Sequence, residues 1–353
     1  MAKEIRFGKS VVSEKGPCYV IAEIGHNHQG ELAKALEMIR VAARSGANAV
    51  KFQKRHNRNL YTAEMYDKPY ENENSYGRTY GEHREKLEFG WEEYVELKRC
   101  AEESGVEFMC APFDRDSVDF LEKLGITSFK FASGDLTNLP LIEYAARLGK
   151  PLFLSTGAAT LDEIRKTYQT VLKHGVPMCI FHCVCEYPAE YGNLNLRLIE
   201  TFKKEFPEAI IGYSSHDNGI LAPVIAYAMG AVVLEKHFTL NRAWKGTDHK
   251  FSLEPEGLRK QVRDLRRYDV MLGDGQKVVR DYEKPIRVKM GKSLYTARAL
   301  KSGHRLSDAD LVIKTPGGAG FMPYELGRVV GRRLRSDVSE ETLLREEHLD
   351  GAA

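Results

Sequence analysis

The sequence predicts an α/β protein: a (β/α)8 barrel of the TIM type, followed by a small C-terminal domain. Short β-rich runs recur along most of the chain, and amphipathic stretches separate them. Polar residues of complementary chemistry stand at the ends of these runs. Beyond residue 272 the alternation stops, and a pattern of short strands and turns begins. The first two observations predict the barrel, and the third predicts the appended domain.

Eight short runs are expected to form the strands of the barrel: residues 19–24, 49–53, 106–111, 128–132, 151–155, 178–183, 210–214 and 232–237. Between them, stretches such as ELAKALEMIRVAARSGA carry apolar residues at helical spacing, here Leu32, Leu36, Ile39 and Ala43. LIEYAARLGK and LDEIRKTYQTVLKHG end at stop signals in which glycine follows lysine or histidine. Strands alternating with helices predict a parallel sheet, and eight such units over about 250 residues fit a closed barrel.

Two segments depart from this rhythm. Residues 54–91, KRHNRNLYTAEMYDKPYENENSYGRTYGEHREKLEFGW, are polar, aromatic and long for a loop. On a barrel such an excursion covers or shapes the substrate site, with a plain surface insertion as the alternative.

The second departure, after residue 272, sets the domain boundaries. We expect residues 1–272 to form the barrel, 273–285 a polar linker and 286–353 the small domain. In that domain the sequence predicts short strands, a turn at Lys301-Ser302-Gly303 and a short capped helix beginning near Ser307.

The composition excludes several classes of partner. The 52 basic and 50 acidic residues are spread along the chain, so it has no concentrated basic face for nucleic acid. No apolar run approaches the roughly 20 residues of a membrane helix. The N-terminal MAKEIRFGKS lacks the apolar centre of a signal peptide. Six cysteines at irregular spacing favour a reducing compartment over a disulfide framework. We therefore expect a cytoplasmic protein with neither a nucleic-acid nor a membrane partner.

Polar side chains gather at the predicted C-terminal ends of the strands, where barrel enzymes keep their chemistry. In chain order these ends offer Glu23, Lys51, Gln53, the turn 112–114, Lys130, Ser133, the segment 155–157, His182, Ser214, His216, Glu235, Lys236 and His237. Any one of them has a structural explanation, such as a stabilising pair between Lys51 and Glu23. The convergence of the whole set on one rim favours a functional site.

The histidines of the rim indicate which kind of metal site the barrel could hold. His26 and His28, in IAEIGHNHQG, have the spacing of an amidohydrolase metal clamp. The fifth strand ends in Ser-Thr-Gly and supplies no further histidine, so we exclude that class. His216 and His237, with a carboxylate and open water positions, instead suit a catalytic Mn²⁺-like or Zn²⁺-like ion.

Two lysines of the rim point to the substrate. Lys51 and Lys130 supply positive charge, and the hydroxyls of Ser133, Ser155 and Ser214 supply directed hydrogen bonds. This combination suits a small molecule that carries both a phosphate and a carboxylate.

These residues also carry a resemblance to a known family. IAEIGHNHQG, VKFQK, KFASGDLTNLP, FLSTGA, FHCVCEYP, GYSSH, LEKHFT and KGTDHKFSLEP stand in the order found in sialic acid synthases. Those enzymes, N-acetylneuraminate and N-acetylneuraminate 9-phosphate synthases, condense phosphoenolpyruvate with an N-acyl mannosamine. The segment from GKSLYTARALKSG to VVGRRL is similar to the antifreeze-like (SAF) domain that they carry. The resemblance spans the whole chain, and the motifs are specific as a set.

The resemblance implies a transferase that forms a carbon–carbon bond and releases phosphate by C–O cleavage. It implies a divalent metal held by His216 and His237, with Mn²⁺ as the expected ion and Mg²⁺ or Co²⁺ as alternatives. The residues expected to bind phosphoenolpyruvate are Lys51, Lys130, Ser133, Ser155, Ser214 and Cys185. Those expected to face the sugar are Gln53, Asp135, Tyr187 and Asp248. The expected catalytic residues are Glu23, Lys51, Lys130 and Asp248, with Glu23 as a general base toward the attacking water.

The same resemblance implies how the chain assembles and what its first motif does. We expect a domain-swapped homodimer in which each C-terminal domain caps the partner's barrel. The turn from Asn27 to Gly30 is expected to shape the rim beside Glu23. Neither His26 nor His28 is then a primary metal ligand.

Four positions depart from the pattern expected of bacterial members: Ala111, Cys185, Ser215 and Thr315. Thr315 stands where an arginine of the antifreeze-like domain is expected to reach the sugar, which leaves the identity of the sugar open. SYGRTYGEHREKLEF resembles animal-type enzymes, which use N-acetylmannosamine 6-phosphate, whereas CEYPAE resembles legionaminate-type enzymes. The candidates for binding a sugar phosphate are Lys54, Arg55, Arg58 and Arg78, with solvated surface positions as the alternative.

Two other functions are weighed against the sialic acid synthase. The first is a synthase for another nonulosonic acid, such as legionaminate or a deaminated sialic acid, which differs only in the sugar pocket. The second is a non-catalytic sugar-binding barrel. The two lysines, Glu23 and the His216/His237 pair argue against the second, because binding alone does not require them together.

Overall fold

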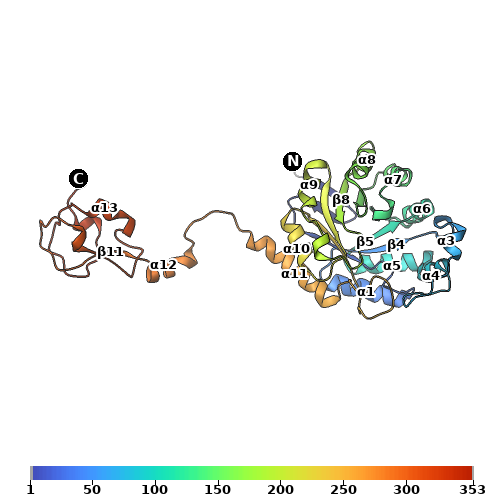
Figure 1. The fold of residues 1–353 in the computed structure, drawn as a ribbon, viewed down its shortest axis with the longest axis horizontal. Coiled ribbons are helices and arrows are strands. Elements are labelled where there is room, and N and C mark those ends of the chain that lie inside the picture. Colours follow the sequence, from blue (N-terminus) through green and yellow to red (C-terminus); the bar gives the residue numbers. More distant parts are fainter. Residues whose placement is uncertain (1–2, 352–353) are drawn as a thin grey trace. The chain divides into compact units, whose positions relative to one another are not determined.

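The computed structural model describes residues 3–351, and the chain divides into two compact units after Gly273. The first unit is a barrel of eight parallel strands ringed by helices (Figure 1). Its strands are β3 (Tyr19–Glu23), β4 (Ala49–Lys54), β5 (Glu107–Pro112), β6 (Phe129–Phe131), β7 (Leu152–Ser155), β8 (Met178–Cys183), β9 (Ile210–Ser215) and β10 (Val233–His237). The predicted (β/α)8 barrel is confirmed.

Strand register places the rim residues beside one another. The hydrogen-bonded order is β5-β4-β3-β10-β9-β8-β7-β6, and β5 lies next to β6 at the remaining seam. In this register Glu23 on β3 stands opposite Lys51 on one side and opposite His237 on the other. Because parallel strands end at the same face, three residues far apart in sequence meet at one edge of the barrel.

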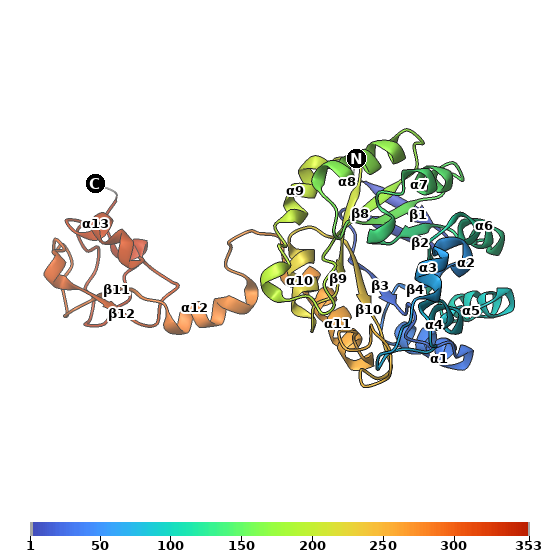
Figure 2. The same cartoon turned by 45° about the vertical axis from the view of Figure 1, so that its right-hand side comes forward.

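The outer ring consists of the helices that the apolar spacing predicts, and Figure 2 shows them surrounding the strands. They are α1 (Leu32–Arg44), α5 (Trp91–Glu103), α6 (Arg115–Leu124), α7 (Leu139–Ala146), α8 (Leu161–Leu172), α9 (Leu198–Glu205), α10 (Leu221–Ala228) and α11 (Pro255–Met271). Local signals fix their ends. In α6, the Asp114 side chain accepts a hydrogen bond from the Ser117 N–H at 2.7 Å, and Gly125 ends the helix in the left-handed conformation.

A short hairpin precedes the barrel. β1 (Glu4–Phe7) and β2 (Ser10–Ser13) pair antiparallel, and Phe7 packs edge-on against Tyr19 and Phe153. Tyr19 begins β3 and Phe153 lies near the beginning of β7, so the hairpin covers the end of the barrel opposite the rim.

The polar excursion is not an irregular loop. It contains three short helices, α2 (Asn57–Leu60), α3 (Ala63–Asp67) and α4 (Tyr80–Leu87). Thr62 and Thr79 cap α3 and α4 by accepting hydrogen bonds from main-chain N–H groups of the first turn.

The second unit has its own small core, built mainly of leucines with Phe321 and two valines. Its elements are α12 (Lys284–Met290), β11 (Ser293–Thr296), β12 (Leu311–Lys314) and α13 (Leu326–Val329). The predicted turn is present, with Gly303 in the left-handed region. The helix expected near Ser307 is instead a single 3₁₀ turn, Asp308–Asp310, because the chain extends again at Leu311 to form β12. Among residues 3–351, no helix is both long and apolar enough to cross a bilayer.

Candidate active site

One cavity of about 620 Å³ opens at the C-terminal rim of the barrel. Its walls include every residue given a catalytic, metal-binding or substrate-binding role by the sequence except Asp135. Two other residues of the predicted rim lie outside it: His182 is 2.7 Å from the Leu194 carbonyl, and Lys236 pairs with Asp217 at 3.3 Å. Asp135 is buried in the 3₁₀ turn that follows β6, and burial raises the pKa of its carboxyl to about 6. The site residues thus converge as the barrel topology predicts, although their roles are not established by position alone.

Four buried charged side chains form the floor of the cavity. Lys51 Nζ lies 2.9 Å from Glu23 Oε2 and 3.4 Å from Glu235 Oε1, and Lys130 Nζ lies 3.7 Å from Glu235 Oε1. Each of these side chains is at most 6% exposed. Buried charges persist only when they are paired, and here two ammonium groups balance two carboxylates. An anionic substrate entering the cavity finds both lysines already held in place.

Burial and charge act on these groups in opposite directions. Burial raises the pKa of Glu23 above its usual value, although Lys51 opposes this. Burial is overcome at Glu235, where Lys130 and Lys51 keep the pKa below its usual value. The pKa of Lys130 is lowered by burial, whereas Glu23 and Glu235 outweigh burial at Lys51 and raise its pKa. Glu23 is therefore the carboxylate of this cluster that binds a proton most readily.

Hydroxyl groups surround the two lysines. Lys130 Nζ donates to Ser155 Oγ and, at 3.1 Å, to the Phe131 carbonyl. Ser214 Oγ donates to Glu235 Oε1 at 3.3 Å. Ser133 Oγ accepts the N–H of Gly157 at 3.0 Å. These small donors sit where the oxygens of a phosphate or carboxylate can replace their present partners.

The two predicted metal ligands face each other across the cavity. The rings of His216 and His237 lie 5.3 Å apart. His216 Nδ1 is 2.7 Å from the Val184 carbonyl, to which it donates, so its Nε2 carries the free lone pair. Burial and His237 lower the pKa of His216 to about 4, and burial also lowers that of His237. Both imidazoles are therefore neutral near pH 7, as metal binding requires.

The histidine pair fits a divalent ion only in part. The buried Nδ1 of His237 has no hydrogen-bond partner and lies 3.7 Å from Asp248 Oδ2. Within residues 3–351, no three His, Cys, Asp or Glu side chains approach closely enough to hold a metal ion by themselves. Two neutral imidazoles with open positions for water and substrate match a catalytic site and not a closed structural one.

Residues assigned to the sugar line the wall beyond Glu23. The side-chain amide of Gln53 makes two hydrogen bonds. Its Nε2 donates to Glu23 Oε1 at 2.6 Å, and its Oε1 accepts from Arg55 Nη2 at 2.7 Å. Tyr187 stacks on His216 with ring centroids 4.3 Å apart. Asp248 lies between His237 and the excursion.

Cys185 gives the cavity a reactive thiol. A hydrogen bond from Cys183 lowers the pKa of Cys185 to about 6, so the Cys185 side chain is largely thiolate near pH 7. All six cysteines are free, and the other five are buried.

The first motif does not form a metal clamp. His28 is buried, accepts the Gly30 N–H at 3.1 Å through Nδ1 and stacks on Phe89. His26 instead lines the cavity, between the guanidinium groups of Arg55 and Arg84. Both rings are thus engaged by other side chains and main-chain groups, and the role expected of the turn stays a prediction.

Several lining residues were not predicted from the sequence. Asn74 and Arg84 come from the excursion, and His26 was assigned only a role in the turn. The length and polarity of residues 54–91 were the signal that could have found them. Of the four candidates for a sugar phosphate, only Arg55 lines the cavity, while Lys54 pairs with Glu88 and Arg58 covers the ring of Tyr66.

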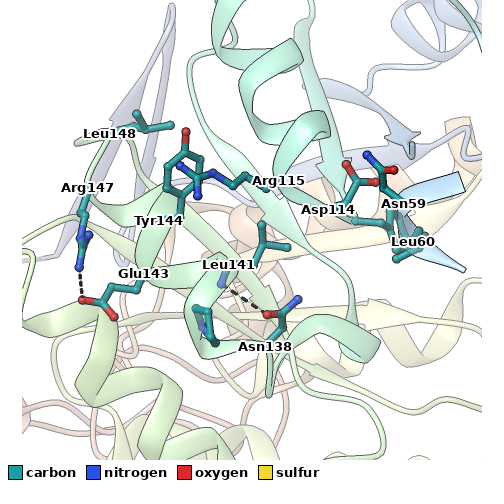
Figure 3. Close-up of a pocket in the computed structure, with 12 residues that line it drawn as sticks. Asn59, Leu60, Asp114, Arg115, Asn138, Leu141, Glu143, Tyr144, Arg147 and Leu148 are labelled. Atoms are coloured by element: carbon teal, nitrogen blue, oxygen red, sulfur yellow. Dashed lines mark hydrogen bonds and ion pairs between the residues drawn. The ribbon is translucent and has the colours of Figure 1, made fainter. Parts of the chain in front are cut away.

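A larger cavity, of about 700 Å³, lies elsewhere on the barrel (Figure 3). Its charged groups are mostly satisfied by one another: Arg147 donates to Glu143 at 2.8 Å, and Arg115 covers the ring of Tyr144. It shares Phe113 with the rim cavity and includes Asp114 of the same turn, but it contains none of the rim lysines, histidines or glutamates. Size alone does not mark the active site.

The fold and the rim are those of a TIM-barrel enzyme, with two buried lysines and a pair of neutral histidines in its cavity. Residues 38–277 match the model of the NeuB family, and residues 291–350 match that of the SAF domain. The chain therefore belongs to the NeuB family, which comprises the sialic acid and related nonulosonic acid synthases.

Relatives and solved structures agree with this assignment. The chain is 38% identical to the human N-acetylneuraminate-9-phosphate synthase, over 96% of this chain and 94% of that one. It is 37% identical to the N,N'-diacetyllegionaminic acid synthase of Legionella pneumophila, over 94% and 95% of the two chains. The crystal structure of a sialic acid synthetase from Leptospira borgpetersenii, in complex with citrate, aligns with a TM-score of 0.71 at 34% identity, covering 81% of this chain and 95% of that one.

Proposed function

We propose that this protein is a transferase that condenses phosphoenolpyruvate with N-acetylmannosamine or its 6-phosphate, giving N-acetylneuraminate or its 9-phosphate and inorganic phosphate. The observation that carries the proposal is the buried cluster of Lys51, Lys130, Glu23 and Glu235 on the floor of the rim cavity. The two lysines suit the charged groups of phosphoenolpyruvate, and Ser133, Ser155, Ser214 and Cys185 orient it.

The reaction divides into two steps whose atoms balance. The C3 carbon of phosphoenolpyruvate attacks the aldehyde carbon of the open-chain sugar, whose oxygen takes up a proton to become a hydroxyl, and water adds at C2. The C2–O bond to the phosphate then breaks, and phosphate leaves. Glu23 accepts a proton from the water, since it is held beside the lysines by Lys51 and Gln53. Gln53, Tyr187 and Asp248 hold the sugar in line, and such positioning supplies much of the rate.

His216 and His237 would hold a divalent cation, with Mn²⁺ as the expected ion and Mg²⁺ or Co²⁺ as alternatives. When bound, such an ion polarises the aldehyde as a Lewis acid. Neutral imidazoles that face each other at 5.3 Å support this assignment.

The first test measures phosphate release from phosphoenolpyruvate with Mn²⁺ and either N-acetylmannosamine or its 6-phosphate. Release that depends on one of these sugars is expected. Release only with a diacetylated legionaminate precursor would favour the alternative synthase, for which the Legionella relative is the supporting observation. No release with any acceptor sugar would favour a binding protein.

The metal assignment has its own test. His237→Ala is expected to lower turnover by more than about 100-fold, because half of the metal's protein ligands are lost. Mn²⁺ binding, followed by electron paramagnetic resonance, should weaken in parallel. His174→Ala is the matched control, since His174 lies outside the cavity beside Glu143. Undiminished Mn²⁺ binding by His237→Ala would contradict the assignment.

We further propose that the enzyme is a domain-swapped homodimer and works in the cytoplasm. The SAF domain has its own core, which allows it to act as a separate cap. Six free cysteines, one of them reactive, fit a reducing compartment. A fully active monomer in sedimentation analysis would contradict the dimer.

A further inference from the structure

Two guanidinium groups meet at one imidazole on the wall of the active-site cavity. Arg55, which follows β4, places Nη1 3.1 Å from His26 Nε2, and Arg84, on α4, places Nη1 3.3 Å from His26 Nδ1. Burial, Arg55 and Arg84 hold the pKa of His26 well below its usual value, so the ring is neutral. A neutral imidazole offers one acceptor and one N–H, and a guanidinium only donates. One ring nitrogen of His26 accepts a hydrogen bond from an arginine. At the other ring nitrogen, the imidazole N–H and the second guanidinium are both donors, so no hydrogen bond forms there.

The positive charge at this point is only partly balanced by carboxylates. Glu88 is the nearest acid to Arg55, at 3.9 Å, and it is shared with Lys54 at 3.2 Å. Arg84 donates to the neutral hydroxyl of Tyr80 at 3.0 and 2.7 Å. No carboxylate oxygen in the described part of the chain lies within 4.0 Å of the Arg84 guanidinium. Asp248, on the same side of the cavity, is closest to His237.

This pair of arginines belongs to the sugar side of the cavity. A hydrogen-bonded chain runs from Arg55 through Gln53 to Glu23, with distances of 2.7 and 2.6 Å, and Glu23 pairs with Lys51. Two side chains thus separate the arginines from the lysines that suit phosphoenolpyruvate. Asn74, Thr247 and Lys250 line the cavity as well and add further donors.

A phosphate monoester supplies the negative charge and the hydrogen-bond acceptors that this wall of the cavity lacks. It carries about −1.5 to −2 charges near pH 7 and three strongly accepting oxygens. Arginine is the side chain best shaped to bind such a group by two parallel hydrogen bonds. An uncharged sugar hydroxyl would leave the Arg84 guanidinium without a charged partner and Arg55 with only its shared contact to Glu88.

We infer that Arg55 and Arg84, with His26 between them, form the binding site for the phosphate of a phosphorylated acceptor sugar. The inference rests on the proposed condensation and selects between its two candidate substrates. It also gives the excursion a function, since α4 delivers Arg84 to the cavity.

The test compares the two sugars with Arg84→Met, which keeps the length of the side chain and removes its charge. With phosphoenolpyruvate saturating, the variant is expected to lower kcat/KM for N-acetylmannosamine 6-phosphate about 10- to 100-fold, mainly through KM, because charge-assisted hydrogen bonds are lost. The value for free N-acetylmannosamine should stay within about twofold. Arg58→Met is the control, because Arg58 covers Tyr66 away from the cavity and its loss should change neither value.

A measurement on the unmodified enzyme keeps the inference testable if the variant does not fold. The wild type should prefer the phosphorylated sugar by at least about tenfold, and this preference should shrink as salt screens the arginines. Equal losses with both sugars in Arg84→Met, or a raised KM for phosphoenolpyruvate, would overturn the inference. Activity with the free sugar alone would overturn it while leaving the condensation standing. No activity with either sugar would instead refute the proposed substrates, and the inference with them.

Discussion

At the scale of single residues, Glu23 is the best-defined group of the site. Its two oxygens face different partners: Gln53 donates to Oε1 at 2.6 Å, and Lys51 pairs with Oε2 at 2.9 Å. The Gln53 contact orients the carboxylate, and the lysine favours its charged form. Burial and Glu235 favour the neutral form and prevail, so the pKa is raised. A carboxylate poised in this way is a better proton acceptor than an exposed glutamate.

The raised pKa of Glu23 predicts an acid limb in the pH profile. A general base acts only when deprotonated, so kcat/KM should fall as pH decreases through a value above the usual 4.5 of a glutamate. Glu23→Gln keeps the shape of the side chain and cannot accept the proton. It should lower kcat by about 10²- to 10⁴-fold, and its residual rate should lack the acid limb.

The matched control for this prediction is Glu88→Gln, because Glu88 pairs with Lys54 and Arg55 outside the lysine cluster. It should keep the acid limb. An unchanged limb in Glu23→Gln would show that another group is the base.

Residue-level prediction from the sequence succeeded where the strand register decides position. Glu23, Lys51 and His237 were predicted to share the rim because parallel strands end at one face, and the strand register places Glu23 opposite both of the others. Arg84 was not predicted, since its position depends on how α4 packs against the rim and not on any strand. Asp135 follows a strand by a few residues, yet the 3₁₀ turn around it buries its side chain away from the cavity lining.

At the scale of elements, the eight strands were located to within a residue or two, because each is a short apolar run buried on both faces. The hairpin of β1 and β2 was not predicted, because four-residue strands with alternating burial give too little periodic signal. Helices α2 and α3 were not predicted either, because helices of four and five residues also give too little periodic signal. These two short polar helices pack against each other and against α4, and a local sequence pattern does not record such contacts.

The position of α4 depends on a glycine in the first motif. Gly30, between β3 and α1, has a positive φ of 74°, and a Cβ atom there would lie 2.1 Å from the Lys86 carbonyl at the end of α4. This close approach of two backbones explains why the motif ends in glycine.

We therefore expect Gly30→Ala to do two things. It should destabilise the barrel by about 2 to 4 kcal/mol, combining the strain of positive φ with the displacement of α4. By moving Arg84, it should also raise KM for the phosphorylated sugar. Thermal unfolding and steady-state kinetics measure the two effects.

Gly149→Ala separates strain from contact. Gly149 has nearly the same φ, 75°, but a Cβ atom there would meet nothing within 4 Å. Its substitution should cost only about 1 kcal/mol and leave KM unchanged. Equal effects at the two glycines would show that contact with α4 is unimportant.

At the scale of the whole molecule, the chain has two hydrophobic cores that share no residue. The larger fills the barrel, and the smaller holds residues of the C-terminal unit together. A core this small contributes little apolar burial, so polar interactions matter more to its stability. The change of pattern after residue 272 predicted a separate C-terminal domain but not this dependence on polar interactions.

Asp310 is the polar centre of the C-terminal unit. The carboxylate is 1% exposed and accepts hydrogen bonds from Arg298 Nη2 at 2.7 Å, His304 Nε2 at 2.9 Å, and both the N–H and Oγ of Ser307 at 2.9 and 2.7 Å. Burial opposes ionisation, but these donors together hold the pKa of Asp310 far below its usual 3.8. A depressed carboxyl pKa contributes stability that is fully present above the unfolded value and is lost as pH falls toward the folded one.

We expect Asp310→Asn to destabilise the C-terminal unit by about 2 to 4 kcal/mol, because the charge is lost and the amide NH₂ takes the place of an oxygen that accepts from the Arg298 guanidinium or the Ser307 N–H, which only donate. Hydrogen exchange resolved by peptide is the measurement: peptides from 291–350 should lose protection at pH 7, while those of the barrel strands keep it. The difference from wild type should shrink as pH drops below about 4, where Asp310 stops contributing its full stabilisation. Asp308→Asn, at an exposed neighbouring position, should leave exchange unchanged. Loss of protection in the barrel strands as well would mean that the two units unfold as one.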